Sequence, residues 1–368
     1  MRLAILGTRG VPASYGGFET FAEELGARLV ERGHKVTVYG RSRSIPRGIT
    51  THRGIDLVRL PAPRSKYLET VVHTIFSAAH AARRDWDAVY VCNLANVPAA
   101  LFLRATGNTV ILNVDGLEWQ RAKWSALGRL YYRLCAWLGS RAPIELVSDA
   151  RVIQRFYRAA YGRPTHYFPY GTDLEPAAED GTLARLRLKP RGYVLYVSRL
   201  EPENNAQLVV DAFSNVRTDM TLALVGDAPY ASQYIRRLKE TAALDRRVVL
   251  LGAHYGRAYQ VLRSNAAAYV QATEVGGTHP ALVEAMGYGN AIAANDVPEH
   301  REVLGDAGLY YRGAAGLTDA LQRLLDDESR NAELRAGATN RARTHYSWDT
   351  VADAYEAWLD ELAHGGGE

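Results

Sequence analysis

The stretch "AAYVQATEVGGTHPALVEAMGYGNAIAAND", residues 267–296, decides the fold class. It opens and closes with short apolar runs, at 267–272 and 291–296, and a helix-like segment lies between them. Each run is continuously apolar rather than alternating, which is typical of a strand covered on both faces of its sheet. Two strands joined through a helix in this way run parallel. The stretch therefore predicts a β-α-β unit.

The same alternation of short strands and helices continues along the whole chain. The predicted strands lie at 3–6, 35–40, 55–60, 88–93, 109–115, 144–149, 193–198, 221–227, 248–253, 267–272 and 291–296. Pro, Gly and acidic residues interrupt the pattern at 166–181. We therefore predict an α/β fold with two Rossmann-like, doubly wound domains that face each other across a cleft.

The interruption sets the expected domain boundaries. The N-terminal domain is predicted to cover residues 1–172 and the C-terminal domain residues 173–346. The segment 347–362 is amphipathic and predicts a helix, whereas the Gly-rich tail 363–368 is expected to be disordered.

The composition predicts a soluble, cytoplasmic protein. Hydrophobic residues make up 47% and charged residues 23% of the 368 positions, which are ordinary values for a globular chain. The opening residues lack the features of a signal peptide, and no run approaches the ~18 apolar residues of a membrane span. Cys92 and Cys135 lie in apolar runs and are expected to be buried thiols.

The charge is divided unequally between the two halves. Residues 1–173 contain 24 Lys and Arg against 13 Asp and Glu, and residues 174–368 contain 20 against 27. We expect the basic half to face an anion. Nucleic acid is disfavoured, because no basic helix, zinc finger or aromatic RNA-binding motif is present. A phospholipid surface or a lipid diphosphate fits better, which would place the protein peripherally at the inner face of the plasma membrane.

A helix predicted at 124–141 bears on this choice. Arg129 and Arg133 lie one turn apart beside Leu, Tyr and Trp residues. This arrangement is typical of an interfacial helix. An ordinary helix packed on the core explains the pattern equally well, so both interpretations stay open.

The loop within the opening stretch predicts an anion site. Gly276 and Gly277 free the backbone, Thr278 and His279 follow, and Pro280 suits the first position of a helix. The amide groups at a helix start attract a diphosphate. Glu284 comes one turn later, where its carboxylate can accept the hydroxyls of a ribose. These residues predict a site for a nucleoside diphosphate.

Other strand ends supply further candidates for this ligand. Arg199 follows the strand 193–198, where its guanidinium could hold a diphosphate in bidentate fashion. The small or polar residues Gly226, Asp227 and His254 follow the next two strands and suit a flat base. In the glycine-rich loop 7–17, the donor candidates are Gly16 and Gly17. The spacing there is not G-x-G-x-x-G, so a dinucleotide site is disfavoured, while a glycine turn without a ligand stays open.

The segment after strand 109–115 predicts a second substrate group. Asp115 could orient an acceptor hydroxyl, and Glu118, Trp119 and Arg121 lie beside it. Alternatively, Asp115 caps a helix and Glu118 completes the capping box. Tyr15, in the glycine-rich loop, is the remaining acceptor candidate.

Several motifs together resemble a known family. They are "GTRGVPASYGGFETFAEEL" (7–25), "DGLEWQRAKW" (115–124), "RLEPENN" (199–205), "VGGTHPALVEAM" (275–286) and "REVLGDAGLYY" (301–311). With them the chain resembles the retaining GT-B glycosyltransferases of family 4, most closely the rhamnosyltransferase-like branch. The resemblance implies transfer without metal or cofactor, the donor on the C-terminal domain, the acceptor on the N-terminal domain, and a last helix that returns to the N-terminal domain.

Some positions depart from the pattern of the broad family. Its first acidic residue would fall on Gly276, and Glu274 is the nearest acid, which makes Glu274 a catalytic candidate. Its usual lysine falls on Asn204, a donor-binding candidate. Within the rhamnosyltransferase-like branch, histidines would be expected where Gln271 and Thr273 stand, and asparagine where His279 stands.

The resemblance implies a specific reaction. A sugar, L-rhamnose from dTDP-rhamnose in this branch, would move to a saccharide or lipid-linked saccharide in cell-surface polysaccharide synthesis. Arg199 and Asp115 would be the other catalytic residues, the first stabilising the departing diphosphate and the second positioning the acceptor. Two alternatives stay open: a nucleotide-sugar 2-epimerase of the same fold, and a non-catalytic partner that binds nucleotide sugars.

Overall fold

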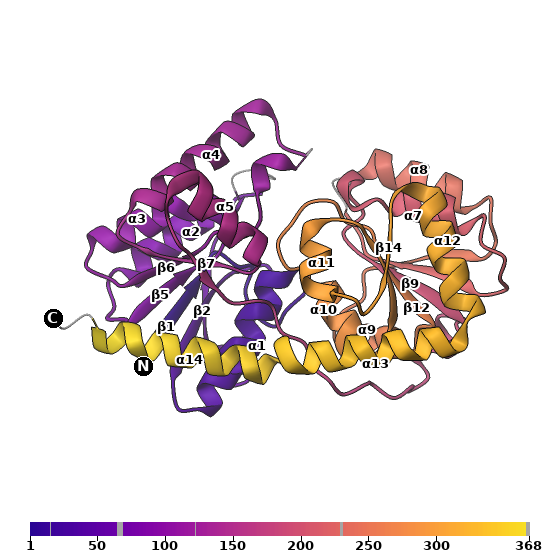
Figure 1. Cartoon of the computed structure of the whole chain (residues 1–368). Coiled ribbons are helices and arrows are strands. Elements are labelled where there is room, and N and C mark those ends of the chain that lie inside the picture. The colour runs from indigo at the N-terminus through magenta and orange to yellow at the C-terminus, as the bar shows by residue number, and fades with distance from the viewer. Residues whose placement is uncertain (15, 65–68, 122, 229–230, 366–368) are drawn as a thin grey trace. The chain divides into compact units, whose positions relative to one another are not determined.

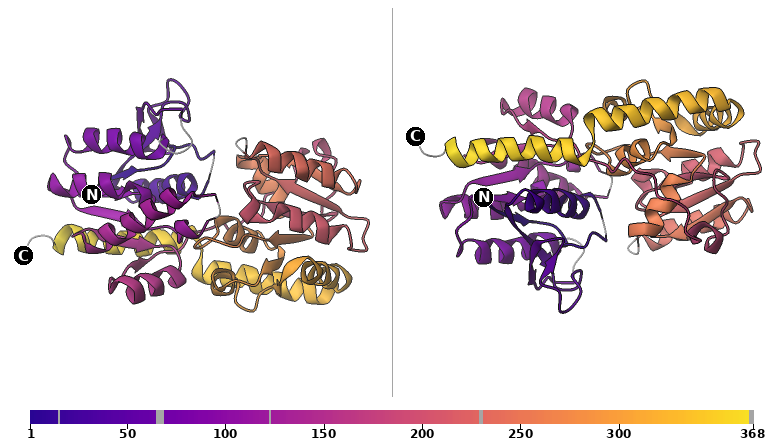
Figure 2. Two further views of the ribbon diagram at one scale, coloured as in Figure 1. Left: turned by 90° about the horizontal axis from the view of Figure 1, so that it is seen from above. Right: turned by 90° about the horizontal axis from the view of Figure 1, so that it is seen from below.

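The computed structural model describes residues 1–14, 16–64, 69–121, 123–228 and 231–365. The chain divides into an N-terminal unit, Met1–Tyr170 with Trp348–Glu368, and a C-terminal unit, Gly171–Ser347 (Figure 1). Each unit is a sheet with helices on both faces (Figure 2). The predicted fold class, two doubly wound α/β domains, is confirmed.

The sheet of the N-terminal unit has the order β3-β4-β2-β1-β5-β6-β7-β8. Within the described residues its neighbours pair in parallel, except for the antiparallel β3 and β4. The strands are β1 (Arg2–Leu6), β2 (Lys35–Arg41), β3 (Thr51–His52), β4 (Ile55–Leu60), β5 (Ala88–Val91), β6 (Val110–Asn113), β7 (Glu145–Ser148) and β8 (His166–Tyr167). The helices are α1 (Gly17–Glu31), α2 (Glu69–Ala81), η1 (Leu94–Asn96), α3 (Val97–Ala105), η2 (Glu118–Gln120), α4 (Ala126–Arg141), α5 (Arg151–Tyr161) and α14 (Trp348–Gly365).

The sheet of the C-terminal unit has the order β11-β10-β9-β12-β13-β14, and all these pairs are parallel. The strands are β9 (Tyr193–Val197), β10 (Thr221–Val225), β11 (Val248–Gly252), β12 (Ala268–Gln271), β13 (Ala291–Asn295) and β14 (Leu309–Tyr311). The helices are α6 (Thr182–Arg185), η3 (Pro202–Asn204), α7 (Ala206–Phe213), α8 (Ser232–Ala242), α9 (Gly256–Ser264), α10 (Pro280–Gly287), α11 (Pro298–Leu304), α12 (Gly313–Asp326) and α13 (Glu328–His345).

All eleven predicted strands are present, each within two residues of the expected bounds. The strands β3, β8 and β14 were missed. They have two, two and three residues and lie at sheet edges, so they are too short to show a period.

The strand order reverses direction once in each sheet. The chain winds from β9 through β10 to β11 on one side, and from β12 through β13 to β14 on the other. The reversal therefore falls between β9 and β12, and in the N-terminal unit it falls between β1 and β5. In open α/β sheets, ligands bind beyond the carboxyl ends of the strands at this switch point.

The last helix, α14, belongs to the N-terminal unit. It buries Trp348, Val351, Ala352, Tyr355, Trp358 and Leu359 in one hydrophobic cluster. The Tyr355 ring stacks on Phe168 with centroids 4.1 Å apart, and Arg28 of α1 pairs with Asp349 at 2.8 Å. The helix continues to Gly365, so the expected disordered tail begins inside it. Residues 366–368 lie outside the described part of the chain.

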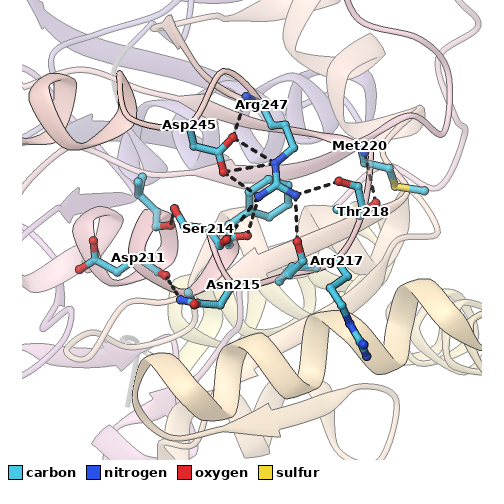
Figure 3. A network of polar contacts seen from close by, with 12 residues as sticks. Asp211, Ser214, Asn215, Arg217, Thr218, Met220, Asp245 and Arg247 are labelled. Atoms are coloured by element: carbon cyan, nitrogen blue, oxygen red, sulfur yellow. Dashed lines mark hydrogen bonds and ion pairs between the residues drawn. The ribbon is translucent and has the colours of Figure 1, made fainter.

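A single arginine organises the turn between α7 and β10 (Figure 3). The guanidinium of Arg247 donates to the carbonyl oxygens of Val216 and Thr218, both at 2.8 Å, and pairs with Asp245 at 2.7 Å. It also lies over the Phe213 ring, 5.1 Å from its centroid. A planar group with five donors can serve several carbonyls at once, which a lysine cannot do.

We predict that Arg247→Met lowers the free energy of unfolding of the C-terminal unit by about 2 kcal/mol, because it leaves these carbonyl oxygens and Asp245 without their donor. Urea unfolding measures the change. The exposed neighbour provides the control, since Arg246→Met removes the same charge without these contacts. Equal effects of the two substitutions would contradict the prediction.

Candidate functional site

Two loops meet at the switch point of the C-terminal sheet. One follows β9 and carries Arg199; the other follows β12 and carries Glu274 and the two glycines. The loops are tied together by Asn205, whose amide nitrogen donates to the Ala272 carbonyl at 3.0 Å and to Oε1 of Glu274 at 2.9 Å. The sequence placed Arg199 and Glu274 in one site, and the structure brings their loops together.

The Arg199 side chain is partly exposed, and its Nη2 lies 3.7 Å from the buried Glu201 carboxylate. Asn204 is buried below it. The side-chain amide nitrogen of Asn204 donates to the backbone carbonyl of Arg199 at 2.7 Å, and the backbone carbonyl of Asn204 accepts from the Tyr196 hydroxyl at 2.6 Å. The structure therefore places Asn204 as a support for the backbone of Arg199.

Gly226 lets the loop after β10 approach the loop after β9. Its φ is 142°, and a Cβ built there would lie 1.7 Å from the carbonyl oxygen of Ser198. No other residue fits this position. Asp227 is exposed and accepts from the Ala228 amide at 2.7 Å, whereas Nε2 of His254 lies 3.1 Å from the Leu251 carbonyl.

The helix start predicted after the two glycines is present. Gly276, Gly277 and Thr278 are buried, and α10 begins at Pro280 with His279 at its N-cap. The His279 ring packs on Gly276, because a Cβ built at Gly276 would lie 2.5 Å from Cε1 of the ring.

Glu284 is held from the side by two residues of α9. Its Oε2 forms an ion pair with Arg263 and accepts from the Tyr259 hydroxyl at 3.1 Å. The Arg263 guanidinium carbon lies 3.8 Å from the ring centroid of Tyr259 and 4.7 Å from that of Tyr288. Burial lowers the pKa of Arg263, but Glu284 and the tyrosines outweigh it and raise the pKa overall. The arginine therefore stays charged.

A buried polar network lies below the glycine loop. The Tyr269 hydroxyl donates to Oε1 of Gln271 at 2.9 Å, and Nε2 of Gln271 donates to Thr273 at 2.5 Å. The Thr273 hydroxyl lies 3.2 Å from Nε2 of His279 and 3.3 Å from Nε2 of His300. Burial lowers the pKa of His300 to about 4, so its ring is neutral at physiological pH.

In the N-terminal unit, Asp115 lies just after β6 in a left-handed turn with φ of 54°. Burial, followed by the nearby Glu118, raises the pKa of its carboxyl group. Asp115 does not cap a helix: the next helical turn, η2, has Leu117 at its N-cap, and α4 is capped by Ser125, whose hydroxyl accepts from the Gly128 amide at 3.3 Å. The alternative of a capping box at Asp115 and Glu118 is therefore wrong.

The neighbours of Asp115 turn inward. Glu118 is buried and pairs with Arg121 at 2.5 Å, while Trp124 donates to it at 3.2 Å. Trp119 packs in the hydrophobic core against Phe156, with ring centroids 5.7 Å apart. Glu118 and Arg121 are the charged neighbours of Asp115, whereas Trp119 belongs to the hydrophobic core.

The glycine-rich loop leads into α1, which begins at Gly17 with Gly16 at its N-cap. Both glycines belong to the N-terminal unit, whereas the other donor candidates belong to the C-terminal unit. Glu19 is buried here and accepts from the Arg9 amide at 2.7 Å, and burial raises its pKa. Tyr15 lies outside the described residues.

The sequence did not single out Tyr259, Arg263, His300 or Glu19. Arg263 stands in the last turn of an amphipathic helix, five residues before the strand β12, and a charge at that point was a usable signal. Within the described residues, no group of three or more His, Cys, Asp or Glu side chains is arranged to hold a metal ion. None of the described helices is both long and apolar enough to cross a membrane.

Two family models match consecutive parts of the chain. Residues 16–189 match the glycosyl transferase 4-like domain, and residues 191–327 match the glycosyl transferases group 1. The chain belongs to the group 1 glycosyltransferases. Both matches agree with the two Rossmann-like units of this glycosyltransferase.

Known proteins of similar length support the fold. The glycosyltransferase is 24% identical to a GDP-mannose-dependent alpha-(1-6)-phosphatidylinositol monomannoside mannosyltransferase of Mycobacterium tuberculosis, over 96% of each chain. It is similar to the structure of sucrose-phosphate synthase from Thermosynechococcus elongatus, with a TM-score of 0.84, 20% identity and 99% of each chain covered. Anabaena HepE in complex with UDP and glucose gives a TM-score of 0.79 at 16% identity, over 98% of this chain and 100% of that chain.

We predict that Arg263→Met costs about 3–5 kcal/mol of unfolding free energy, because it leaves the Glu284 carboxylate without its cation in a buried setting. The double variant Arg263→Met/Glu284→Leu removes both charges and should regain most of that loss. Urea unfolding of the wild type, the single variant and the double variant measures both the loss and the recovery of unfolding free energy. If the double variant is as unstable as the single one, the unpaired Glu284 carboxylate is not the cause of the lost unfolding free energy.

Proposed function

We propose that this glycosyltransferase retains the anomeric configuration without a metal and binds a nucleoside diphosphate sugar at the switch point of its C-terminal unit. The observation that carries the proposal is the placement of Glu284. Its carboxylate is held by Arg263 and Tyr259, one turn beyond the start of α10. A fixed carboxylate suits the hydroxyls of a ribose, and the helix start suits the diphosphate.

In the proposed reaction, the main task of the site is to stabilise the negative charge of the departing diphosphate. The sugar leaves with its bond to the diphosphate broken, and the negative charge grows on the phosphate oxygen. Arg199 and the backbone amides after Gly277 stabilise that charge, with one such donor contributing ~3 kcal/mol. The acceptor hydroxyl attacks from the same face and gives its proton to the departing oxygen. Asn205 holds the Glu274 carboxylate on the loop that meets the loop of Arg199, and Asp115 of the N-terminal unit positions the acceptor.

The proposed donor is a nucleotide-activated hexose, with L-rhamnose from dTDP-rhamnose suggested by the motif resemblance. The similar mycobacterial protein is named for GDP-mannose, and Anabaena HepE was solved with UDP. Three nucleotides are therefore to be compared. The proposed acceptor is a saccharide or lipid-linked saccharide of cell-surface polysaccharide synthesis.

We predict that one of dTDP, UDP and GDP, at ~100 times its dissociation constant, stabilises the wild type by ~2.7 kcal/mol. Thermal unfolding with each nucleotide and its common sugar conjugates measures this. Arg199→Ala and Glu284→Gln should lose most of the ligand-induced shift, whatever their own stability. Arg236→Ala, an exposed arginine of α8, is the control and should keep it. If none of the three nucleotides raises the unfolding temperature of the wild type, the proposed function is contradicted.

We also propose that α4 docks on an anionic membrane. Leu127, Leu130, Leu134 and Trp137 are exposed at 77%, 61%, 50% and 46%, and their spacing puts them on one stripe. Arg129, Arg133 and Arg141 are exposed beside this stripe, while the opposite face of α4 packs on the core through Tyr132, Cys135 and Ala136. Apolar side chains flanked by cations fit a lipid surface that carries negative charge.

Helix α3 packs against both α2 and α4, and all three helices carry exposed apolar side chains. Ile75 and Phe76 of α2 and Phe102 of α3 are exposed at 46%, 48% and 47%. A membrane-bound enzyme would meet a lipid-linked acceptor directly, so the surface supports that class of acceptor.

We predict that the protein sediments with vesicles containing anionic lipid at low salt, and that Leu130→Glu/Leu134→Glu reduces the bound fraction at least tenfold. Leu244→Glu, at a leucine exposed at 87% in the C-terminal unit, is the matched control and should bind like the wild type. Binding that is unaffected by the α4 substitutions, or absent in the wild type, would contradict docking through α4.

A further inference from the structure

The loop between β12 and α10 contains a histidine whose ring covers a glycine. The position that carries the first acidic side chain of the resembling family is Gly276, which is buried. A Cβ built there would lie 2.5 Å from Cε1 and 2.9 Å from Nε2 of His279. No side chain fits at position 276 while the His279 ring keeps this place, so the ring occupies the space next to the backbone that an acidic residue would otherwise use.

The network below the ring determines the direction of its hydrogen bonds. The Asn295 carbonyl lies 2.8 Å from Nδ1 of His300, so Nδ1 carries the proton and Nε2 has the lone pair. The Tyr269 hydroxyl donates to Oε1 of Gln271, which turns the Gln271 amide nitrogen toward Thr273 and His300. That nitrogen has two protons and lies 2.5 Å from the Thr273 hydroxyl and 3.3 Å from Nε2 of His300.

The Thr273 hydroxyl has one proton and lies 3.2 Å from Nε2 of His279 and 3.3 Å from Nε2 of His300. When the second Gln271 proton goes to the single lone pair on Nε2 of His300, the Thr273 proton is left for Nε2 of His279. A neutral imidazole that accepts at Nε2 carries its proton at Nδ1. His300 stays neutral because burial lowers its pKa to about 4. In this arrangement the buried chain favours the His279 tautomer that carries its proton at Nδ1.

We propose that His279 is the residue that recognises the donor sugar, as a hydrogen-bond donor through Nδ1, and that Thr273, Gln271 and His300 position it for that role. The inference rests on the proposed function, because it assumes a nucleotide sugar at the start of α10. A carboxylate at position 276 could only accept a hydrogen bond from a sugar hydroxyl, whereas an Nδ1–H group donates one to a sugar oxygen. The direction of the hydrogen bond to the donor sugar is therefore reversed at this point.

Calorimetric titration separates the sugar contact from the nucleotide contact. For the wild type, the nucleotide sugar identified in the thermal screen should bind more tightly than the bare nucleoside diphosphate. His279→Ala should keep the affinity for the diphosphate within about twofold and weaken the nucleotide sugar by about tenfold or more, the effect of one lost hydrogen bond. Thr273→Val, which removes only the hydroxyl, should weaken the nucleotide sugar alone.

Nitrogen-15 NMR of the histidine rings adds a measurement that a merely structural role would not affect. The wild type should show His279 protonated at Nδ1, and Thr273→Val should shift it toward the Nε2 tautomer. Gly276→Ala is the matched steric test. It should impair sugar binding when His279 is present and cause no further loss in the His279→Ala background, because the collision is then removed.

The outcomes are distinct. If no nucleotide binds the wild type, the proposed function fails first. If the diphosphate binds but His279→Ala leaves the nucleotide sugar unaffected, or weakens both ligands equally, the role of His279 as the sugar contact is wrong. If Nε2 rather than Nδ1 is protonated in the wild type, the proposed direction of the network is wrong.

Discussion

The pairing of β9 with β12 is the constraint on which the C-terminal unit depends. The chain reaches β10 and β11 on one side of this pair and β13 and β14 on the other, so the strand order reverses between the loops after β9 and β12, which Asn205 ties together. Arg199 comes from one loop and Glu274 from the other. Gly226 lets the loop after β10 press against Ser198. The site is therefore a consequence of strand order before any side chain is considered.

The buried ion pair of Arg263 and Glu284 is explained better by ligand binding than by stability. The pair of Arg263 and Glu284 is largely buried, and taking two charges out of water costs more than well-packed apolar side chains would. The tyrosines around Arg263 reduce that cost through contacts with its guanidinium. Stability alone gives little reason to keep a carboxylate here, whereas a ligand with adjacent hydroxyls does. This contrast is the physical argument for treating Glu284 as a binding residue.

Much of this could be predicted from the sequence, and the failures have physical causes. Continuous apolar runs revealed the buried strands, while the short edge strands β3, β8 and β14 gave no periodic signal. Gly277 and Pro280 indicated the helix start, because both follow from backbone geometry alone. Trp119 and Asn204 are predicted ligand contacts, and both side chains are buried in the structure. A position at a strand end does not reveal which way a side chain points. The partners of Glu284 lie more than twenty residues before it, and only folding brings them together.

The departures from the family pattern are scattered in the sequence but gather in one place in the structure. Gln271, Thr273, Gly276 and His279 form a continuous set of contacts, from a buried amide to a ring that packs on a glycine. Side chains that share hydrogen bonds and space do not change independently. The His279 ring takes the space that a side chain at 276 would need, and the Thr273 hydroxyl lies within hydrogen-bond distance of it. Contacts of this kind among four residues argue against decay of the site.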